Sequence, residues 1–98
     1  VRDNIPDIIK QTGDKPDFVI LDSPDYYNEL KKKLTEEVSE FNDSDEIMEL
    51  CDVVEVISAI LDYKNIGDEE FEKMRSAKNK ANGKFEKRIF LNGVDRMK

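Results

Sequence analysis

Segment 23–63, SPDYYNELKKKLTEEVSEFNDSDEIMELCDVVEVISAILDY, decides the fold. Its apolar residues recur every three or four positions, which is the period of an α-helix. The opening Ser-Pro-Asp is typical of a helix start, with the serine as the cap. The polar run at 42–45 interrupts the pattern. We therefore predict one helix from Ser23 to about Phe41 and a second over about 45–65.

Shorter elements flank this pair. Residues 4–12 predict a helix that ends at Gly13, and Asp68 would cap a fourth helix ending near Asn82. The connections between the last three helices are short, so we expect these helices to pack antiparallel. The predicted fold class is all-α: an antiparallel bundle of about four helices in a single domain, residues 1–98.

A small β element could accompany the bundle. The apolar runs at 18–21 and 87–91 contain β-forming residues, and they could pair as short strands. The chain has only 98 residues, of which 38% are hydrophobic and 40% charged, so its core must be thin. We therefore expect oligomerisation, as a homodimer or homotetramer, to complete the bundle.

Composition excludes several classes of function. No apolar run is long enough to span a membrane, so we expect no membrane partner. The chain has no histidine and one cysteine, Cys51, which fits a reducing, cytoplasmic location and excludes Ser–His or Cys–His catalysis. The net charge of −7 argues against a nucleic-acid partner. Residues 1–71 carry 20 acidic and 7 basic side chains, whereas residues 72–98 carry 3 and 9.

Two pairs of carboxylates interrupt apolar helix faces. Glu37 projects into the apolar stripe of the first long helix, with Glu40 at the margin and Glu36 further round. Glu49 and Asp52 fall on the apolar arc of the next helix. Each pair has an i,i+3 spacing, and an antiparallel arrangement places both pairs at similar heights above the connecting turn. A solvated side chain is the ordinary alternative for any one of these acids.

Four carboxylates that converge in a groove require cations. Lys33 supplies only one positive charge, so Mg²⁺ or Mn²⁺, which prefer oxygen ligands, is the expected cofactor. Cationic side chains of the fourth helix and the tail, among them Arg75, Lys78 and Arg88, could bind a polyphosphate, although each could equally be a solubility residue. Cys51 lies within an apolar arc that covers most of its helix, so we expect a buried cysteine.

These residues carry a family resemblance. Glu36-Glu37-Val38-Ser39-Glu40 followed by Glu49-Leu50-Cys51-Asp52 resembles the EExxE…ExxD signature of the all-α nucleoside triphosphate pyrophosphohydrolases, the MazG-like enzymes. The opening VRDNIP (1–6) and the closing GKFEKRIFL (83–91) are similar to one small MazG-like subgroup. The resemblance spans nearly the whole chain.

The resemblance implies a function and a set of roles. The function is Mg²⁺-dependent hydrolysis of the α–β phosphate bond of a nucleoside triphosphate, in a housecleaning role, to a monophosphate and pyrophosphate. Metal ligands and catalytic residues would be Glu37, Glu40, Glu49 and Asp52, with Glu36 orienting water. Contacts to the phosphates and base would come from Lys33, Arg75, Lys78 and Asn79.

Other interpretations stay open at this point. One is a phosphoribosyl-ATP pyrophosphohydrolase, although the Tyr-His pair that typically follows the second acid of ExxD in those enzymes is replaced by Val53-Val54. Another is a noncatalytic helical module that binds a nucleotide or oligomerises. The sequence also leaves open the preferred base, the number of metal ions, whether Glu36 or Glu55 accepts the proton, and the role of residues 2–4.

Overall fold

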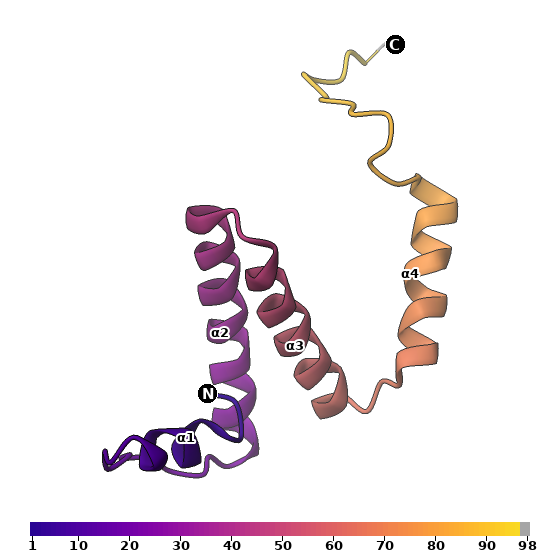
Figure 1. Cartoon of the computed structure of the whole chain (residues 1–98). Helices are drawn as coiled ribbons and strands as arrows, with labels where there is room; N and C mark the ends of the chain where they lie inside the picture. Colours follow the sequence, from indigo (N-terminus) through magenta and orange to yellow (C-terminus); the bar gives the residue numbers. More distant parts are fainter. Residues whose placement is uncertain (97–98) are drawn as a thin grey trace. The chain divides into compact units, whose positions relative to one another are not determined.

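The fold is described from a computed structural model (Figure 1), which covers residues 1–96. Positions 97–98, the end of the predicted domain, lie outside the described residues. Residues 1–96 form helices and no strand, so the all-α prediction is confirmed. The helices are α1 (Ile5–Gln11), α2 (Ser23–Ser44), α3 (Ile47–Tyr63) and α4 (Asp68–Asn82).

The chain divides into two compact units. The first unit, residues 1–60, holds α1, α2 and most of α3. The second unit, residues 61–98, holds the end of α3, α4 and the segment that follows it. Each unit is described by itself. The single domain and the packing of α4 against the other helices stay predictions.

In the first unit, α2 and α3 lie side by side and run in opposite directions (Figure 1). This is the antiparallel pair that the sequence predicts. The start of α2 differs from the prediction by one residue, because Asp22 is the cap and its carboxylate accepts a hydrogen bond from the Asp25 amide at 3.1 Å. Ser23 is instead the first helical residue. An aspartate immediately before Ser-Pro offers the better acceptor for the free amides of the first turn.

The turn between α2 and α3 is only two residues long. Helix α2 continues past Phe41 to Ser44, and Asp45 ends it in a left-handed conformation (φ 58°). The Asp45 amide donates to Phe41 O at 2.7 Å, and the Glu46 amide donates to Ser44 Oγ at 3.2 Å. These bonds satisfy backbone groups that the helix ends would otherwise leave free. The short turn therefore fixes the positions of α2 and α3 relative to each other along their axes.

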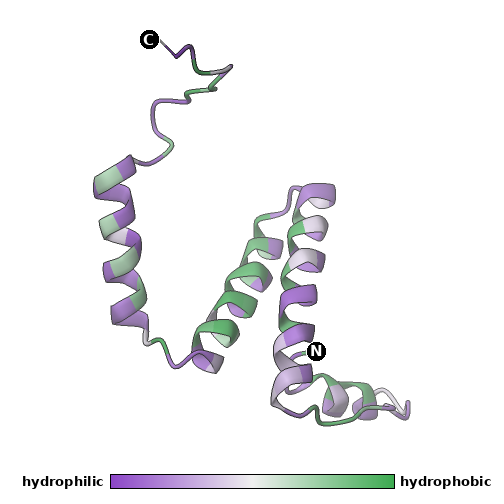
Figure 2. Ribbon diagram, turned by 180° about the vertical axis from the view of Figure 1, so that it is seen from behind, coloured by the Kyte–Doolittle hydropathy of each residue, from purple (hydrophilic) through white to green (hydrophobic). Residues whose placement is uncertain are grey.

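Helix α3 is less covered than the sequence predicts. Figure 2 shows it as strongly hydrophobic along its length, yet Val56, at 8% exposed, is the one hydrophobic residue of the described part of the chain that counts as buried. Met48 is 74% exposed and Val54 62% exposed. Cys51, predicted as a core residue, is also exposed. The apolar arc is wider than the face that α2 alone can cover, so part of it stays in contact with solvent.

Neither predicted strand forms. Residues 18–21 have no regular secondary structure, and residues 87–91 overlap a turn in which the Arg88 amide donates to Phe85 O at 3.3 Å. The prediction of a β accessory is therefore wrong for the described residues. β-forming composition creates a strand only where a partner strand supplies the ladder, and these runs have none.

Helix α4 begins at Asp68, with Gly67 rather than Asp68 at the cap position, and Gly83 follows its last residue. Asp68, Glu69 and Glu70 occupy its first turn, where negative charge complements the helix dipole. No helix in the described part of the chain combines the length and apolar character that crossing a membrane requires.

Candidate metal centre

Glu37 is the central residue of the site. It lies on the α2 face that turns toward α3, in a stripe whose other members Leu30, Leu34 and Phe41 are half-buried. Glu37 itself is only 6% exposed and is the one buried charged residue among those described. The sequence predicts this position from helical periodicity, and the structure confirms it. A buried carboxylate has a high free-energy cost unless cations or donors compensate for it.

The four predicted metal ligands lie in two carboxylate clusters that share Glu37. Glu36, Glu37 and Glu40 each place a carboxylate oxygen within 4.8 Å of the other two, and Glu37, Glu49 and Asp52 do the same. Glu37 thus belongs to both clusters, and it links the α2 carboxylates to those of α3. Glu49 and Asp52 are half-buried, whereas Glu36 and Glu40 are exposed. The i,i+3 spacing on each helix and the short turn produce this convergence.

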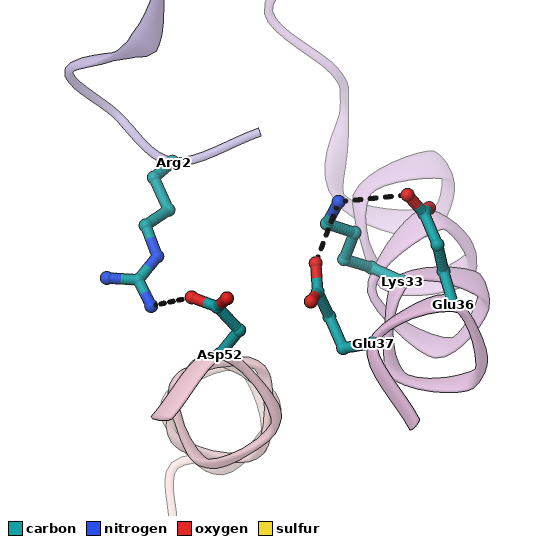
Figure 3. A network of polar contacts seen from close by, with 5 residues as sticks. All are labelled: Arg2, Lys33, Glu36, Glu37 and Asp52. Atoms are coloured by element: carbon teal, nitrogen blue, oxygen red, sulfur yellow. Dashed lines mark hydrogen bonds and ion pairs between the residues drawn. The ribbon is translucent and has the colours of Figure 1, made fainter. Parts of the chain in front are cut away.

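Lys33 is the nearest cation on α2. Its Nζ donates to Glu37 Oε1 at 3.0 Å and to Glu36 Oε1 at 3.3 Å (Figure 3). Hydrogen bonding to Glu37 is the main reason that the pKa of Lys33 is raised, so this side chain stays charged. Lys33 is one turn before Glu37 on the same helix, which makes the pairing local.

A second cation reaches the site from the chain start. Arg2 Nη2 donates to Asp52 Oδ1 at 2.6 Å, across 50 residues of sequence (Figure 3). The sequence leaves the role of residues 2–4 open and gives no helical pattern that relates Arg2 to α3. Of those residues, Asn4 is the cap residue of α1 but makes no side-chain capping bond. The only sequence signal for Arg2 is a positive charge next to an acidic, apolar region.

One atom of Glu37 has no partner. Glu37 Oε2 is buried and accepts no hydrogen bond from any donor in the described residues. The Lys33 hydrogen bond nevertheless lowers the pKa of Glu37 more than desolvation raises it, and Arg2 adds a smaller lowering. Only two helices surround the carboxylate, so its desolvation is incomplete. The lowered pKa keeps Glu37 ionised at neutral pH, and its Oε2 has no hydrogen-bond partner among the described residues.

The pKa of Glu40 is shifted in the opposite direction, upward. Hydrogen bonding to Glu37 and repulsion from its charge are the main causes that raise the pKa of Glu40, and Glu49 and Glu36 add to the repulsion. When Glu40 is protonated it can donate to the Glu37 carboxylate; when it is ionised that donor is lost. The cluster thus holds more negative charge than Lys33 and Arg2 neutralise, and a proton or a cation relieves the excess.

The chemistry of the donors fits a hard divalent cation. All of the clustered ligand atoms are carboxylate oxygens, which Mg²⁺ and Mn²⁺ prefer, and no sulfur or imidazole is among them. The unpartnered Glu37 Oε2 is an additional, independent indication that the cluster lacks one positive partner. Glu36, Glu37, Glu40, Glu49 and Asp52 are the residues that could hold one or two such ions.

The remaining predicted substrate contacts belong to the second unit: Arg75, Lys78, Asn79 and Arg88. They are not members of either carboxylate cluster. Arg75 binds Glu72 through two hydrogen bonds of 3.0 Å, from Nε and Nη2. Lys78 and Arg88 are exposed, and Asn79 is half-buried, with its backbone carbonyl accepting from the Gly83 amide. Their contact with a substrate stays a prediction.

The sequence offers two candidate proton acceptors, Glu36 and Glu55. Glu36 lies in the first cluster and accepts a hydrogen bond from Lys33. Glu55 is exposed and belongs to neither cluster. Of these two carboxylates, Glu36 is therefore the one next to the candidate metal ligands.

Comparison with known proteins gives no further support for an assignment. No family model matches the chain, and searches of curated proteins and of solved structures find no significant match.

Proposed function

We propose that this protein is a Mg²⁺-dependent nucleotide pyrophosphohydrolase that cleaves the α–β phosphate bond of a nucleoside triphosphate. The observation that carries the proposal is the buried, ionised Glu37 with its unpartnered Oε2 at the junction of two carboxylate clusters. Two i,i+3 acidic pairs on antiparallel helices supply those clusters. The resemblance of Glu36–Glu40 and Glu49–Asp52 to the EExxE…ExxD signature agrees with this function but is not independent of the same residues.

The proposed mechanism assigns a task to each side chain. Glu37, Glu40, Glu49 and Asp52 would hold one or two divalent ions, which would neutralise phosphate charge and make the attacking water more acidic. Hydrolysis forms a bond from the water oxygen to the α-phosphorus and breaks the bridging P–O bond, so pyrophosphate leaves with the electron pair. Glu36 accepts the proton of the attacking water, as its place beside the ligands allows.

Lys33 has two tasks in this proposal. Without substrate it compensates the charge of Glu37 and Glu36, at 3.0 and 3.3 Å. Its side chain is 34% exposed, so its ammonium group can also donate to a phosphate oxygen at the edge of the cluster. Arg75, Lys78, Asn79 and Arg88 are the further phosphate and base contacts proposed from the sequence.

The experiment is a pyrophosphate-release assay over a panel of ordinary and modified nucleoside triphosphates and phosphoribosyl-ATP, with Mg²⁺, Mn²⁺ or EDTA. We expect release that requires a metal and falls at least about 100-fold in Glu49→Gln. The matched control is Glu29→Gln, the same substitution on α2 at an exposed glutamate that pairs with Lys32 outside both clusters. Stoichiometric nucleotide binding without release would contradict the enzyme and identify a noncatalytic binding module.

We also propose that the chain acts as a homo-oligomer in the cytoplasm. The exposed apolar residues of α3, among them Met48 and Val54, support an interface with a second copy, because Val56 is the one buried hydrophobic residue of those described. The free thiol of Cys51 fits a reducing compartment. Sedimentation velocity tests the first point, and a monomer at assay concentration would contradict it.

A further inference from the structure

Among residues 1–96, Arg2 supplies the one contact to the cluster that comes from outside α2 and α3. It precedes α1, and its guanidinium group reaches Asp52 with a single hydrogen bond of 2.6 Å (Figure 3). The Ile5 amide donates to Arg2 O at 3.0 Å, so the backbone of this residue is tied to the first turn of α1. The position of the chain start on the first unit is therefore coupled to one carboxylate oxygen of α3.

This contact uses the carboxylate of a candidate metal ligand. Asp52 is one of the three residues in the cluster with Glu37 and Glu49, and its Oδ1 is the atom bonded to Arg2. A divalent cation bound at this carboxylate would compete with the guanidinium group for its negative charge. Both are positive, so they also repel each other across the cluster.

The Arg2–Asp52 pair is weak enough to exchange. The two side chains are 57% and 41% exposed, and one nitrogen makes the contact. Exposed pairs of this kind contribute little because water screens the charges and two flexible side chains must be ordered. The Lys33–Glu37 pair differs, since both residues are on α2 and the Glu37 side chain is only 7% exposed. Of the two cations, Arg2 is the one that an incoming ion can replace at low cost.

We propose that Arg2 is a competing counterion that sets the affinity of the cluster for divalent cations. In the metal-free chain the guanidinium group occupies Asp52. Metal entering beside Glu37 and Glu49 takes over the Asp52 carboxylate and releases Arg2, together with the contact that ties the residues before α1 to α3. This inference rests on the metal site of the proposed function, but it requires no hydrolysis.

The first test measures Mn²⁺ affinity by counting free ion with electron paramagnetic resonance. Arg2→Gln should bind Mn²⁺ about three- to tenfold more tightly than the unsubstituted chain, because competition and repulsion are both removed. The matched control is Lys10→Gln, which removes the same charge from the last turn of α1 and should change the affinity less than about twofold. Equal or weaker binding by Arg2→Gln would overturn the proposal.

A second test observes Arg2 directly in the unsubstituted chain. The ¹⁵N side-chain signals of arginine are followed by NMR in EDTA and then during a titration with Mg²⁺, with Arg2→Gln used only to assign the Arg2 signal. We expect a restrained guanidinium signal in EDTA that changes to the free, rapidly exchanging form in proportion to bound Mg²⁺. An Arg2 signal that stays restrained at saturation would overturn the proposal.

These results separate the inference from the proposed function. Tight Mn²⁺ binding with the expected Arg2 behaviour and no pyrophosphate release would leave the inference intact and reject the enzyme. Metal-dependent release with equal affinities for the unsubstituted chain and Arg2→Gln would do the reverse. If neither protein binds Mn²⁺, the inference fails on the binding data alone.

Discussion

The α2–α3 pair and α4 are both rich in charged residues, yet their charges are used differently. On α2 and α3, carboxylates from two helices meet around the buried Glu37, and cations reach them from α2 and from the chain start. On α4, Arg75 pairs with Glu72 three residues away, and both side chains are more than half exposed. Charged composition alone therefore does not distinguish a site from a solvated surface.

The difference arises from how far each helix face is covered by neighbouring structure. Glu37 has a second helix opposite, so most of its side chain is shielded from water and its charge needs specific partners. Glu72 and Arg75 are both more than half exposed. Each shifts the pKa of the other, but an exposed pair of this kind adds little to the stability of the fold. Variants that change single charges in the two regions can test how far this contrast extends, beginning with the residue that both clusters share.

Glu37→Gln should have the largest effect on metal binding. It removes the ligand common to both clusters and the charge of the buried Oε2, so Mn²⁺ affinity should fall at least about 100-fold in a calorimetric titration. The matched control is Glu72→Gln on α4, which should leave the affinity unchanged. Equal affinities for Glu37→Gln and the unsubstituted chain would show that the cluster is not the metal site.

Metal should stabilise the fold through the same residues. Mg²⁺ at about 100 times its dissociation constant should raise the melting temperature by about 10 °C, as expected for a ligand that binds only the folded state of a domain of this size. Differential scanning fluorimetry measures the shift. The double variant Glu37→Gln/Glu49→Gln should show none, whereas Glu29→Gln/Glu72→Gln should retain it. A shift in the first double variant would place the ion elsewhere.

Lys33→Met should destabilise the metal-free chain in a pH-dependent way. The pKa of Glu37 is lowered from 4.5, mainly by Lys33, so this pair contributes stability above about pH 4.5 that is lost as the pH falls through the folded pKa. Allowing for the exposure of Lys33, we expect a loss of about 1 kcal/mol at pH 7 in urea unfolding. That loss should disappear toward pH 3.

Two further points sharpen this prediction. Lys32→Met removes an exposed lysine that pairs with Glu29, and its effect should be smaller at every pH. The raised pKa of Glu40 acts with the opposite sign: its contribution is present at low pH and is lost as the pH rises through the folded value. A Lys33→Met loss that does not vary with pH would mean that lost packing, not charge, is responsible.

The smallest effect should come from α4. Arg75→Gln breaks an exposed i,i+3 pair and should lower the melting temperature by less than about 2 °C. The same scanning measurement checks this value in high and low salt, with Lys73→Gln as the control for loss of one positive charge. A larger, salt-insensitive decrease would show that α4 carries a buried interaction in the assembled protein. The charges of α4 would then differ less from those of α2 and α3.

The sequence predicts the helices and the α2–α3 carboxylates well because both depend on local spacing. Helical periodicity alone places Glu37 within the apolar stripe, and i,i+3 spacing on both sides of a short turn brings Glu49 and Asp52 toward it. The helix starts are less well predicted, since Asp22 and Gly67 are the caps in place of Ser23 and Asp68. Neighbouring polar residues offer nearly equal capping energies.

Features that depend on distant partners could not be predicted. Arg2 meets Asp52 across 50 residues, and no local pattern relates a residue before α1 to a position on α3. The apolar runs at 18–21 and 87–91 lack a pairing strand, which composition does not reveal. The exposure of Cys51 has the same origin, because periodicity identifies an apolar face but not what covers it.

The two-residue turn has a consequence for how this chain tolerates insertions and deletions. A residue added between Ile47 and Glu49 would rotate the carboxylates of α3 by about 100° and move them about 1.5 Å along the axis, away from Glu37. A residue added at 13–21, which is extended and exposed for the most part, would change no helix position. In this chain an insertion or deletion between Glu40 and Glu49 should therefore weaken metal binding far more than one at 13–21.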